Sequence, residues 1–272
     1  MPLARKFTWV TFNYEENDIG YFSFDAAGNM TANPSSGASI SYNLIDQPSN
    51  IGGNNNIGYL YSYGGERIQA IDTINAGSAD ERIRVRTYAG PMQFVNDTLE
   101  RITHSEGRIL IDQDDREAHL QYRIGDHLNN TVVSFEPASF CKAEGRDKNG
   151  DGILQDPEDI LFKKLYYPYG MALSGILPDS TTPPARYLYN NKEFEKEGGV
   201  YFYGARLFVL MIGRFAGVDP IAEQFPHVSV FNYAENEPVG HIDLWGLQKY
   251  KPDAPAPSGI TPIGSSTVPQ GR

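Results

Sequence analysis

The sequence predicts an all-β protein, and three observations lead to this fold class. The chain of 272 residues is rich in aromatic residues that favour strands, with 17 Tyr and 14 Phe. It is also rich in residues that make turns, with 27 Gly and 18 Pro. No stretch shows the sustained apolar periodicity of a long amphipathic helix. We therefore expect many short strands joined by turns.

The first hundred residues contain a loose repeat. Alternating aromatic residues at 21–24 lead into the turn residues Asp25, Gly28 and Asn29, and similar patterns recur at residues 41–43 and 59–65. Alternation places one face of a strand on a core, and the small polar residues favour the turn beside it. Stacked β-hairpins produce a repeat of this size. The alternative is an ordinary β-domain whose segments are similar by chance.

Further strands follow along the chain, separated by clusters of Gly, Pro and Asn. They are expected at residues 82–88, 108–112, 118–124, 131–135, 187–189 and 200–208. The last of these contains the alternating aromatics Tyr201 and Tyr203. Only residues 214–215 and 219–224 favour a helical turn. The all-β prediction therefore extends to residue 247.

The patterns divide the chain into four segments. Residues 1–20 form an N-terminal segment, residues 21–165 a β-region with the repeat, and residues 166–247 a second β-region. Residues 248–272 are rich in Pro, Gly, Ser and Thr and contain few large apolar residues. Such a composition cannot bury enough surface to order itself, so we expect a disordered tail.

Charge and targeting signals narrow the function classes. The net charge of −11 argues against a nucleic-acid partner, because phosphates need a basic surface. No stretch is long and apolar enough to span a membrane. The N-terminal residues lack the apolar core and cleavage site of a signal peptide, so export would need a larger precursor or a dedicated machine. Cys141 is the only cysteine, which excludes an intrachain disulfide.

Residues 147–158 match the calcium-loop pattern D-x-[DN]-x-[DN]-G-x5-E at every specified position. Side-chain oxygens at positions one, three and five suit Ca²⁺, Gly152 allows the sharp turn, and the last position closes the site with two oxygens. Pro157 and the extended pattern after it argue against flanking helices. We expect a structural Ca²⁺ site between strands, with a solvated acidic loop as the alternative. The expected ligands are Asp147, Asn149, Asp151, Ile153 through its carbonyl, Gln155 through water, and Glu158.

Several motifs occur in an order that resembles one known family. The chain is similar to the RHS-repeat-associated core of YD-repeat polymorphic-toxin shells, which are related to toxin-complex C subunits and to teneurin YD shells. The resemblance covers residues 20–247 and is strongest from residue 166 onward. The motifs are FDAAGN (24–29), YGGERI (63–68), YAGPMQFV (88–95), LERITHSEGR (99–108), YRIGDHLNNT (122–131), YYPYGM (166–171), RYLYNNKE (186–193), YFYGARLF (201–208), IGRFAGVDPIAE (212–223) and FNYAENEPVGHIDLWGL (231–247).

The resemblance implies a β-sheet of YD-repeat hairpins that spirals into part of a hollow shell. Residues 21–165 would form the shell, and residues 166–247 would form the core that plugs its end. The implied partners are a C-terminal effector polypeptide, the chain's own or an associated one, and upstream shell repeats. The implied location is the cell surface or the medium, as part of a larger RHS system.

The family resemblance also implies self-cleavage by an aspartate pair with a supporting arginine. The matching residues here are Asp219, Asp243 and Arg214, and the bond cut would be Leu247–Gln248. Two carboxylates held close cannot both ionise, so one serves as an acid while the other activates water. Their separation in sequence does not show that they meet. The chain is therefore at most an aspartic autoprotease that acts on itself.

Two departures from the family pattern weaken the case for cleavage. Residues 208–211 are apolar where the family has Tyr-Asp-Pro, and Leu244 replaces the proline of the usual DPxGL motif. The aspartates alternatively occupy ordinary turns. Two further hypotheses stay open: a surface-exposed, calcium-stabilised module that binds glycan or protein, and a vestigial product of a truncated RHS gene.

Overall fold

The computed structural model describes residues 21–53, 55–113, 116–136, 160–173 and 185–252. These residues form strands and short 3-10 turns without an α-helix, which confirms the all-β prediction. The first thirteen strands are consecutive neighbours in one antiparallel sheet, which we call the wall. The wall strands are β1 (Ser23–Phe24), β2 (Met30–Asn33), β3 (Ala38–Tyr42), β4 (Pro48–Gly52), β5 (Asn56–Tyr61), β6 (Arg67–Ile74), β7 (Arg82–Ala89), β8 (Met92–Val95), β9 (Thr98–His104), β10 (Gly107–Ile111), β11 (Ala118–Gly125), β12 (Thr131–Phe135) and β13 (Ile160–Lys163).

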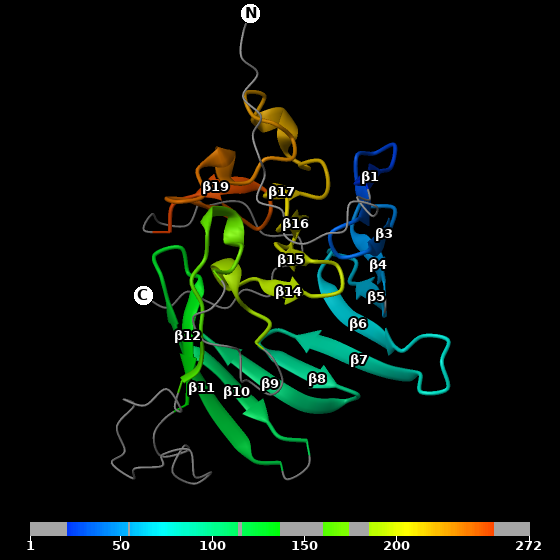
Figure 1. Ribbon diagram of the computed structural model, residues 1–272, viewed down its shortest axis with the longest axis vertical. Helices are drawn as coiled ribbons and strands as arrows, with labels where there is room; N and C mark the ends of the chain where they lie inside the picture. Colours follow the sequence, from blue (N-terminus) through cyan, green and yellow to red (C-terminus); the bar gives the residue numbers. More distant parts are fainter. Residues whose placement is uncertain (1–20, 54, 114–115, 137–159, 174–184, 253–272) are drawn as a thin grey trace, which may run out of the picture.

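Two smaller sheets form a second part of the fold, which we call the plug. Figure 1 shows the wall curving around it from β1 on one side to β12 on the other. A four-stranded antiparallel sheet and a two-stranded hairpin make up the plug. Its strands are β14 (Glu193–Glu195), β15 (Val200–Phe202), β16 (Leu207–Val209), β17 (Arg214–Phe215), β18 (Ile242–Leu244) and β19 (Gln248–Tyr250).

Three of the wall hairpins, at Asp25, Asn43 and Asp126, share one kind of turn, and two of them fall in the loose sequence repeat. The Asp25 side chain accepts hydrogen bonds from the backbone N–H groups of residues two and four positions later, at 2.9 and 2.8 Å. Asn43 and Asp126 make the same pair of bonds in their own turns, at 2.9–3.0 Å. The residue three positions on has a positive φ, 87° at Gly28 and 55° at Asp46. These side chains replace backbone partners and so favour a tight reversal.

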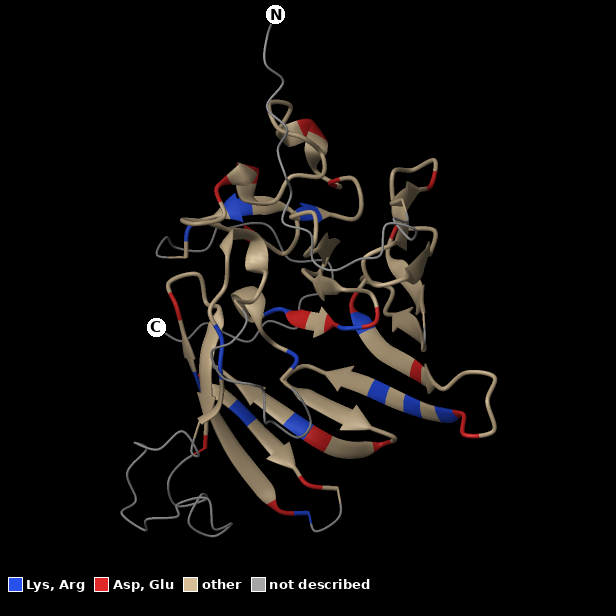
Figure 2. Cartoon of the chain, viewed as in Figure 1, with Lys and Arg blue, Asp and Glu red and all other residues tan. Residues whose placement is uncertain are grey.

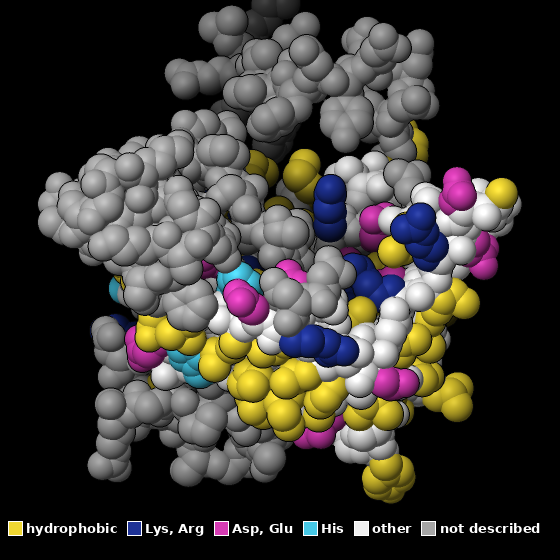
Figure 3. Space-filling view, turned by 90° about the horizontal axis from the view of Figure 1, so that it is seen from below, with side chains coloured by type: hydrophobic (Ala, Val, Ile, Leu, Met, Phe, Trp, Pro, Cys, Tyr) yellow, Lys and Arg dark blue, Asp and Glu magenta, His cyan; other side chains and the backbone are white. Residues whose placement is uncertain are grey.

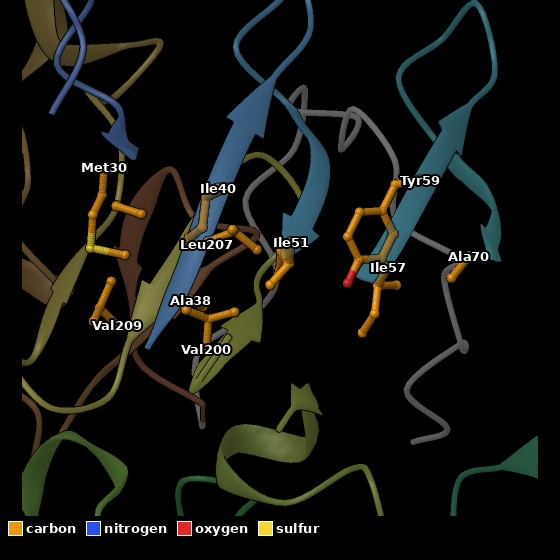
Figure 4. Close-up of a cluster of buried hydrophobic side chains, with 11 residues drawn as sticks. Met30, Ala38, Ile40, Ile51, Ile57, Tyr59, Ala70, Val200, Leu207 and Val209 are labelled. Atoms are coloured by element: carbon orange, nitrogen blue, oxygen red, sulfur yellow. The ribbon is translucent and has the colours of Figure 1, made fainter. Parts of the chain in front are cut away.

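The sheet β14–β17 buries both of its faces, because strand alternation sends successive side chains to opposite sides. Figure 4 shows Val200, Leu207 and Val209 packed on the apolar side chains of β2–β6. The intervening side chains Tyr201 and Phe208 join an aromatic cluster on the other face. Full burial of each aliphatic side chain contributes roughly 1.5–3 kcal/mol. The plug is therefore part of the core that the wall folds around.

Two strand predictions and one helical-turn prediction are wrong. Residues 200–208 form two strands, since Gly204 with φ of 100° lets the chain reverse between β15 and β16. Residues 187–189 give only an isolated bridge at Tyr187 before the 3-10 turn η2 (Tyr189–Asn191). Residues 214–215, expected in a helical turn, form β17 instead because they pair with β16. The other expected turn, at 219–224, contains the 3-10 turn η3 (Ala222–Gln224).

The disordered tail was predicted to begin at residue 248, which is too early. Residues 248–250 form β19, which pairs antiparallel with β18 from Gln248 opposite Leu244 to Tyr250 opposite Ile242. Pairing with an adjacent strand supplies the order that composition alone does not. Residues 253–272 lie outside the described part of the chain, as do residues 1–20.

Candidate functional site

The structure brings the two candidate aspartates together on one arginine, Arg206. Arg206 lies in the turn between β15 and β16, Asp219 follows β17, and Asp243 is in the middle of β18. Nη2 of Arg206 lies 2.9 Å from Oδ2 of Asp219 and 3.9 Å from Oδ2 of Asp243. All three side chains are buried. Residues far apart in the sequence thus share one buried site.

Arg206 also ties three backbone segments together. Its Nε donates to the carbonyl oxygen of Gly246 at 2.5 Å, and its Nη1 donates to that of Val230 at 3.0 Å. Its guanidinium lies 3.8 Å from the ring centroid of Phe215. The planar guanidinium suits this use, since its donors point in fixed directions and its face stacks on aromatic rings. Arg206 therefore sets the positions of the segments that carry Asp219 and Asp243.

Burial favours the neutral form of Asp243. It raises the pKa of this carboxyl to about 7, although Arg206 and the backbone amides of Ala234 and Leu247 act in the opposite direction. Among the described residues, Oδ1 of Asp243 has no hydrogen-bond donor. An unpartnered buried carboxylate oxygen is costly, and protonation reduces that cost. Asp243 is therefore suited to hold a proton near neutral pH.

Asp219 has more partners for its ionised form. Its Oδ1 accepts the backbone N–H of Ile221 at 2.9 Å, while its Oδ2 faces Arg206. Burial raises the pKa of Asp219 above its usual value, and Arg206 and the amide of Ile221 oppose that rise. The two carboxyls thus occupy different environments, as an acid and base pair requires.

Arg214 does not lie at this site. Its side chain is exposed on β17, while Arg206 occupies the position beside both aspartates. The YFYGARLF motif contains Arg206, but the family resemblance pointed to Arg214, the arginine of IGRF, for the supporting role. The available signal was the position of Arg206 in a Gly-containing turn between two aromatic strands, where a buried charge needs acidic partners.

The bond between Leu247 and Gln248 joins the turn of the β18–β19 hairpin to the first residue of β19. Trp245 and Gly246 make the turn with φ of 61° and 74°. A Cβ at Gly246 would lie 3.1 Å from the backbone nitrogen of Arg206, so glycine allows both the conformation and the close approach. Leu247 is buried, and its amide is one of those that act on Asp243. The hairpin thus holds the candidate cleavage bond close to the carboxyl of Asp243.

Aromatic and amide side chains form the surroundings of the pair. The hydroxyls of Tyr203 and Tyr233 lie 2.5 and 2.6 Å from Oδ1 of Asn190. The Asn190 side chain donates in turn to the carbonyl oxygen of Leu128, at 2.9 Å, which connects the plug to the wall. This buried network had no counterpart in our sequence predictions.

A second buried cluster joins the wall to the plug through charge. Arg86 of β7 is 1% exposed, and its guanidinium contacts Asp72 at 2.6 Å, Glu195 at 3.1 Å and Glu193 at 3.3 Å. Arg67 of β6 pairs with the same Glu193. Figure 2 shows acidic and basic bands on β6, β7 and β14 in the region where β14 lies beside the wall. Buried charges without partners are expensive, so this cluster fixes the plug against one region of the wall.

The predicted calcium ligands at 147–158 lie outside the described residues. The strands on either side, β12 and β13, are antiparallel partners, with Phe135 opposite Ile160. The loop therefore connects the two arms of a hairpin. Within the described ranges, no group of three His, Cys, Asp or Glu side chains is placed to hold a metal ion. No helix in those ranges is long and apolar enough to cross a membrane.

Comparison with known proteins identifies the fold. No family model matches the chain. Salivary gland surface protein 1 of Aedes aegypti is 38% identical over 80 residues, which make up 29% of this chain and 2% of that protein. The chain thus spans only a small part of that relative.

Solved structures agree over a much larger part of the chain. A crystal structure of TcdB2-TccC3 aligns over 82% of this chain with a TM-score of 0.63 and 20% identity. A Photorhabdus luminescens Tc holotoxin pore with a substitution in TccC3 aligns over 88%, with a TM-score of 0.63 and 19% identity. This chain covers 11% of each of those chains. It therefore has an RHS-like β-shell fold, as the sequence motifs predicted.

Proposed function

We propose that this chain is the closing part of an RHS-type shell that holds a C-terminal effector polypeptide. The observation that carries the proposal is the buried charge cluster that fixes the plug against the curved wall. A continuous antiparallel sheet hides its backbone groups and extends by adding hairpins at the β1 edge. The chain covers about a tenth of the similar TccC3-containing chains, which leaves room for further repeats in the full protein. We expect such a system at the cell surface or in the medium.

Protease protection tests this proposal. A reporter polypeptide with many trypsin sites is joined after Arg272, and RHS repeats are placed ahead of the wall. Encapsulation predicts that the reporter survives trypsin concentrations that digest it when it is free. The control carries Arg86→Met, which weakens the joint between wall and plug. Equal digestion of the free and the joined reporter would overturn the proposal.

The buried carboxyl pair favours a second function, self-cleavage after Leu247. In this proposal Asp219 is the base and takes a proton from a water molecule, whose oxygen attacks the carbonyl carbon of Leu247. Asp243 is the acid and gives its proton as the C–N bond to Gln248 breaks, which leaves a carboxylate at Leu247 and an amine at Gln248. Arg206 keeps Asp219 ionised. The support for this assignment is the different burial and partners of the two carboxyls.

Intact mass of the folded chain tests self-cleavage. We expect a product that ends at Leu247 in the wild type and its absence in Asp243→Asn. Arg206→Gln should slow the cut, while Arg214→Gln should not, since only Arg206 contacts the aspartates. Asp97→Asn, at an exposed turn, is the matched control for the amide substitution. A wild-type chain that is folded and stays uncut between pH 4 and 9 refutes the autoprotease and leaves the structural role.

One surface feature supports the alternative of a binding module. Figure 3 shows hydrophobic side chains gathered on the face seen from below the wall. The exposed large hydrophobic residues of the nearby strands include Ile83, Met92 and Ile124. Exposed apolar side chains gathered on one face favour contact with another molecule. Most plug tyrosines are buried, however, which argues against an aromatic glycan-binding face. Failure of the chain to bind immobilised glycans would leave only a protein partner for this surface.

A further inference from the structure

Strand β19 begins with the residue that follows the candidate cleavage bond, and its own packing is modest. Its three residues, Gln248–Tyr250, are all half-buried, and in the described part of the chain its sheet contains one other strand, β18. A two-stranded hairpin by itself is marginally stable in water. Leu247, on the other side of the bond, is buried. The bond therefore joins a fixed residue to a strand that needs a further anchor.

The side chain of Lys249 supplies such an anchor. Its Nζ lies 2.8 Å from Oε2 of Glu235 and 3.4 Å from Oε1 of Glu237. The side chains of Lys249 and Glu235 are each 24% exposed, so this pair is partly shielded from water. Ion pairs that share one cation form a network, which holds its geometry better than an isolated exposed pair does. A single residue, Gln248, separates this network from the candidate cleavage bond.

The closer carboxylate extends from a turn that the core holds in place. Glu235 is the middle residue of the 3-10 turn η4 (Ala234–Asn236), whose three residues have positive φ, of 46°, 51° and 65°. This conformation is uncommon for residues other than glycine and persists only where surrounding contacts impose it. The backbone N–H of Glu235 donates to Oδ1 of Asn232 at 2.8 Å, and Ala234 is 0% exposed within the aromatic cluster. The plug therefore fixes the place at which Glu235 meets Lys249.

The register of the hairpin relates this anchor to the proposed acid. Lys249 is the cross-strand partner of Asp243, and Gln248 is that of Leu244. The nitrogen of Gln248 is the leaving group, so the position of β19 decides whether the Asp243 proton can reach it. Misplacement of reacting groups by about 1 Å can slow a reaction roughly 100-fold. A contact that keeps β19 in register therefore has a direct effect on the rate of the cut.

We propose that Lys249 is a positioning residue for self-cleavage, whose ion pairs with Glu235 and Glu237 hold the nitrogen of Gln248 within reach of Asp243. This inference rests on the proposed self-cleavage and names the contact that keeps the leaving group in place. Lys249 acts through the position of β19 and takes no part in the transfer of protons. Its contribution therefore depends on the ion pairs and can be rebuilt with the charges exchanged.

Charge reversal and charge exchange in the full chain test this role, with intact mass followed over time. Lys249→Glu turns both ion pairs into repulsions and should slow the cut about tenfold or more. Lys251→Glu makes the same change in net charge at an exposed position and should leave the rate within about twofold. The double variant Glu235→Lys, Lys249→Glu rebuilds the closer pair in reverse and should recover most of the rate. An unchanged rate in Lys249→Glu, or no recovery in the double variant, would overturn the proposal.

Amide hydrogen exchange provides a second measurement, which does not depend on cleavage. In the full chain with Asp243→Asn, which stays whole, Lys249→Glu should make the amide hydrogens of β19 exchange about tenfold faster and leave those of β16 unchanged. Addition of Glu235→Lys should restore slow exchange in β19. Equal exchange of β19 with and without Lys249→Glu would overturn the proposal. If the wild type never cuts itself, self-cleavage fails, while this exchange still decides whether Lys249 holds β19.

Discussion

Replacement of Arg86 by methionine is expected to destabilise the fold strongly. Arg86 contacts three buried carboxylates, those of Asp72, Glu193 and Glu195, within 2.6–3.3 Å. Methionine fills most of the space but leaves these carboxylates with a cation fewer. Removal of one partner from a buried ion pair costs about 3–5 kcal/mol. In a domain of this size each kcal/mol lowers Tm by about 2–4 °C, so the expected loss is roughly 10 °C.

Arg84→Met is the matched control for this experiment. Arg84 lies two residues earlier on the same strand and contacts the same Asp72 at 2.7 Å, but its side chain is 39% exposed. A solvated pair contributes about 0–1 kcal/mol, so Tm should fall by less than about 4 °C. Thermal unfolding monitored by circular dichroism at pH 7 provides both values. Similar losses in the two variants would refute the argument that burial decides the effect.

The pH dependence of Tm provides a further check on the contacts between Arg86 and the buried carboxylates. Burial alone would raise the pKa of Glu193, but Arg67 and Arg86 outweigh it and hold the pKa below its ordinary value. A group with a lowered folded pKa stabilises the fold above its unfolded pKa, about 4.3, and loses that contribution as pH falls through the folded pKa. The Tm difference between wild type and Arg86→Met should therefore shrink below about pH 4. A constant difference from pH 7 to pH 3 would contradict this explanation.

Two further predictions concern the calcium loop and the outer face of the wall. Ca²⁺ at 100 times its Kd should stabilise the wild type by about 2.7 kcal/mol, and Glu158→Ala should abolish the rise in Tm; an equal rise in the variant would remove the proposed site. Ile83→Thr should change stability by less than about 0.5 kcal/mol, since Ile83 is 61% exposed. Ile51→Thr, at a side chain that is 0% exposed, should cost about 2 kcal/mol or more in denaturant unfolding, and a smaller loss than in Ile83→Thr would contradict the assigned faces.

Local sequence patterns predicted the strands because hairpin formation is local. The expected strand at 131–135 matches β12, and that at 82–88 lies within β7. The turns at Asp25, Asn43 and Asp126 were equally predictable, because each of these side chains bonds to a backbone N–H group within five residues of it. The error at 200–208 arose where one Gly decided between a continuous strand and a hairpin, and aromatic residues continued on both sides of Gly204.

The candidate site was only partly predictable, because its geometry depends on long-range packing. Motif order selected Asp219 and Asp243, and the structure places both on Arg206. Motif order also selected Arg214, whose exposed side chain lies elsewhere. The local difference between the two arginines is that Arg206 lies in the turn between β15 and β16 while Arg214 begins β17, and this difference alone does not show which side chain is buried. The distinction comes from burial against Phe215 and from the β18–β19 hairpin, which only the folded plug supplies.

Strand β7 shows why alternation alone misassigns the faces of this sheet. Its sequence, RIRVRTYA, places Arg at every second position, and the usual interpretation turns Ile83 and Val85 inward. The structure turns Arg86 inward, where it is 1% exposed, and leaves Ile83 exposed. The inward choice is set by the acidic residues of β14. A slip of one residue in β7 would turn Arg86 outward and leave Glu193 and Glu195 without their shared cation. The buried charges therefore specify the register in which the wall meets the plug. A uniformly apolar interface would specify this register less strictly.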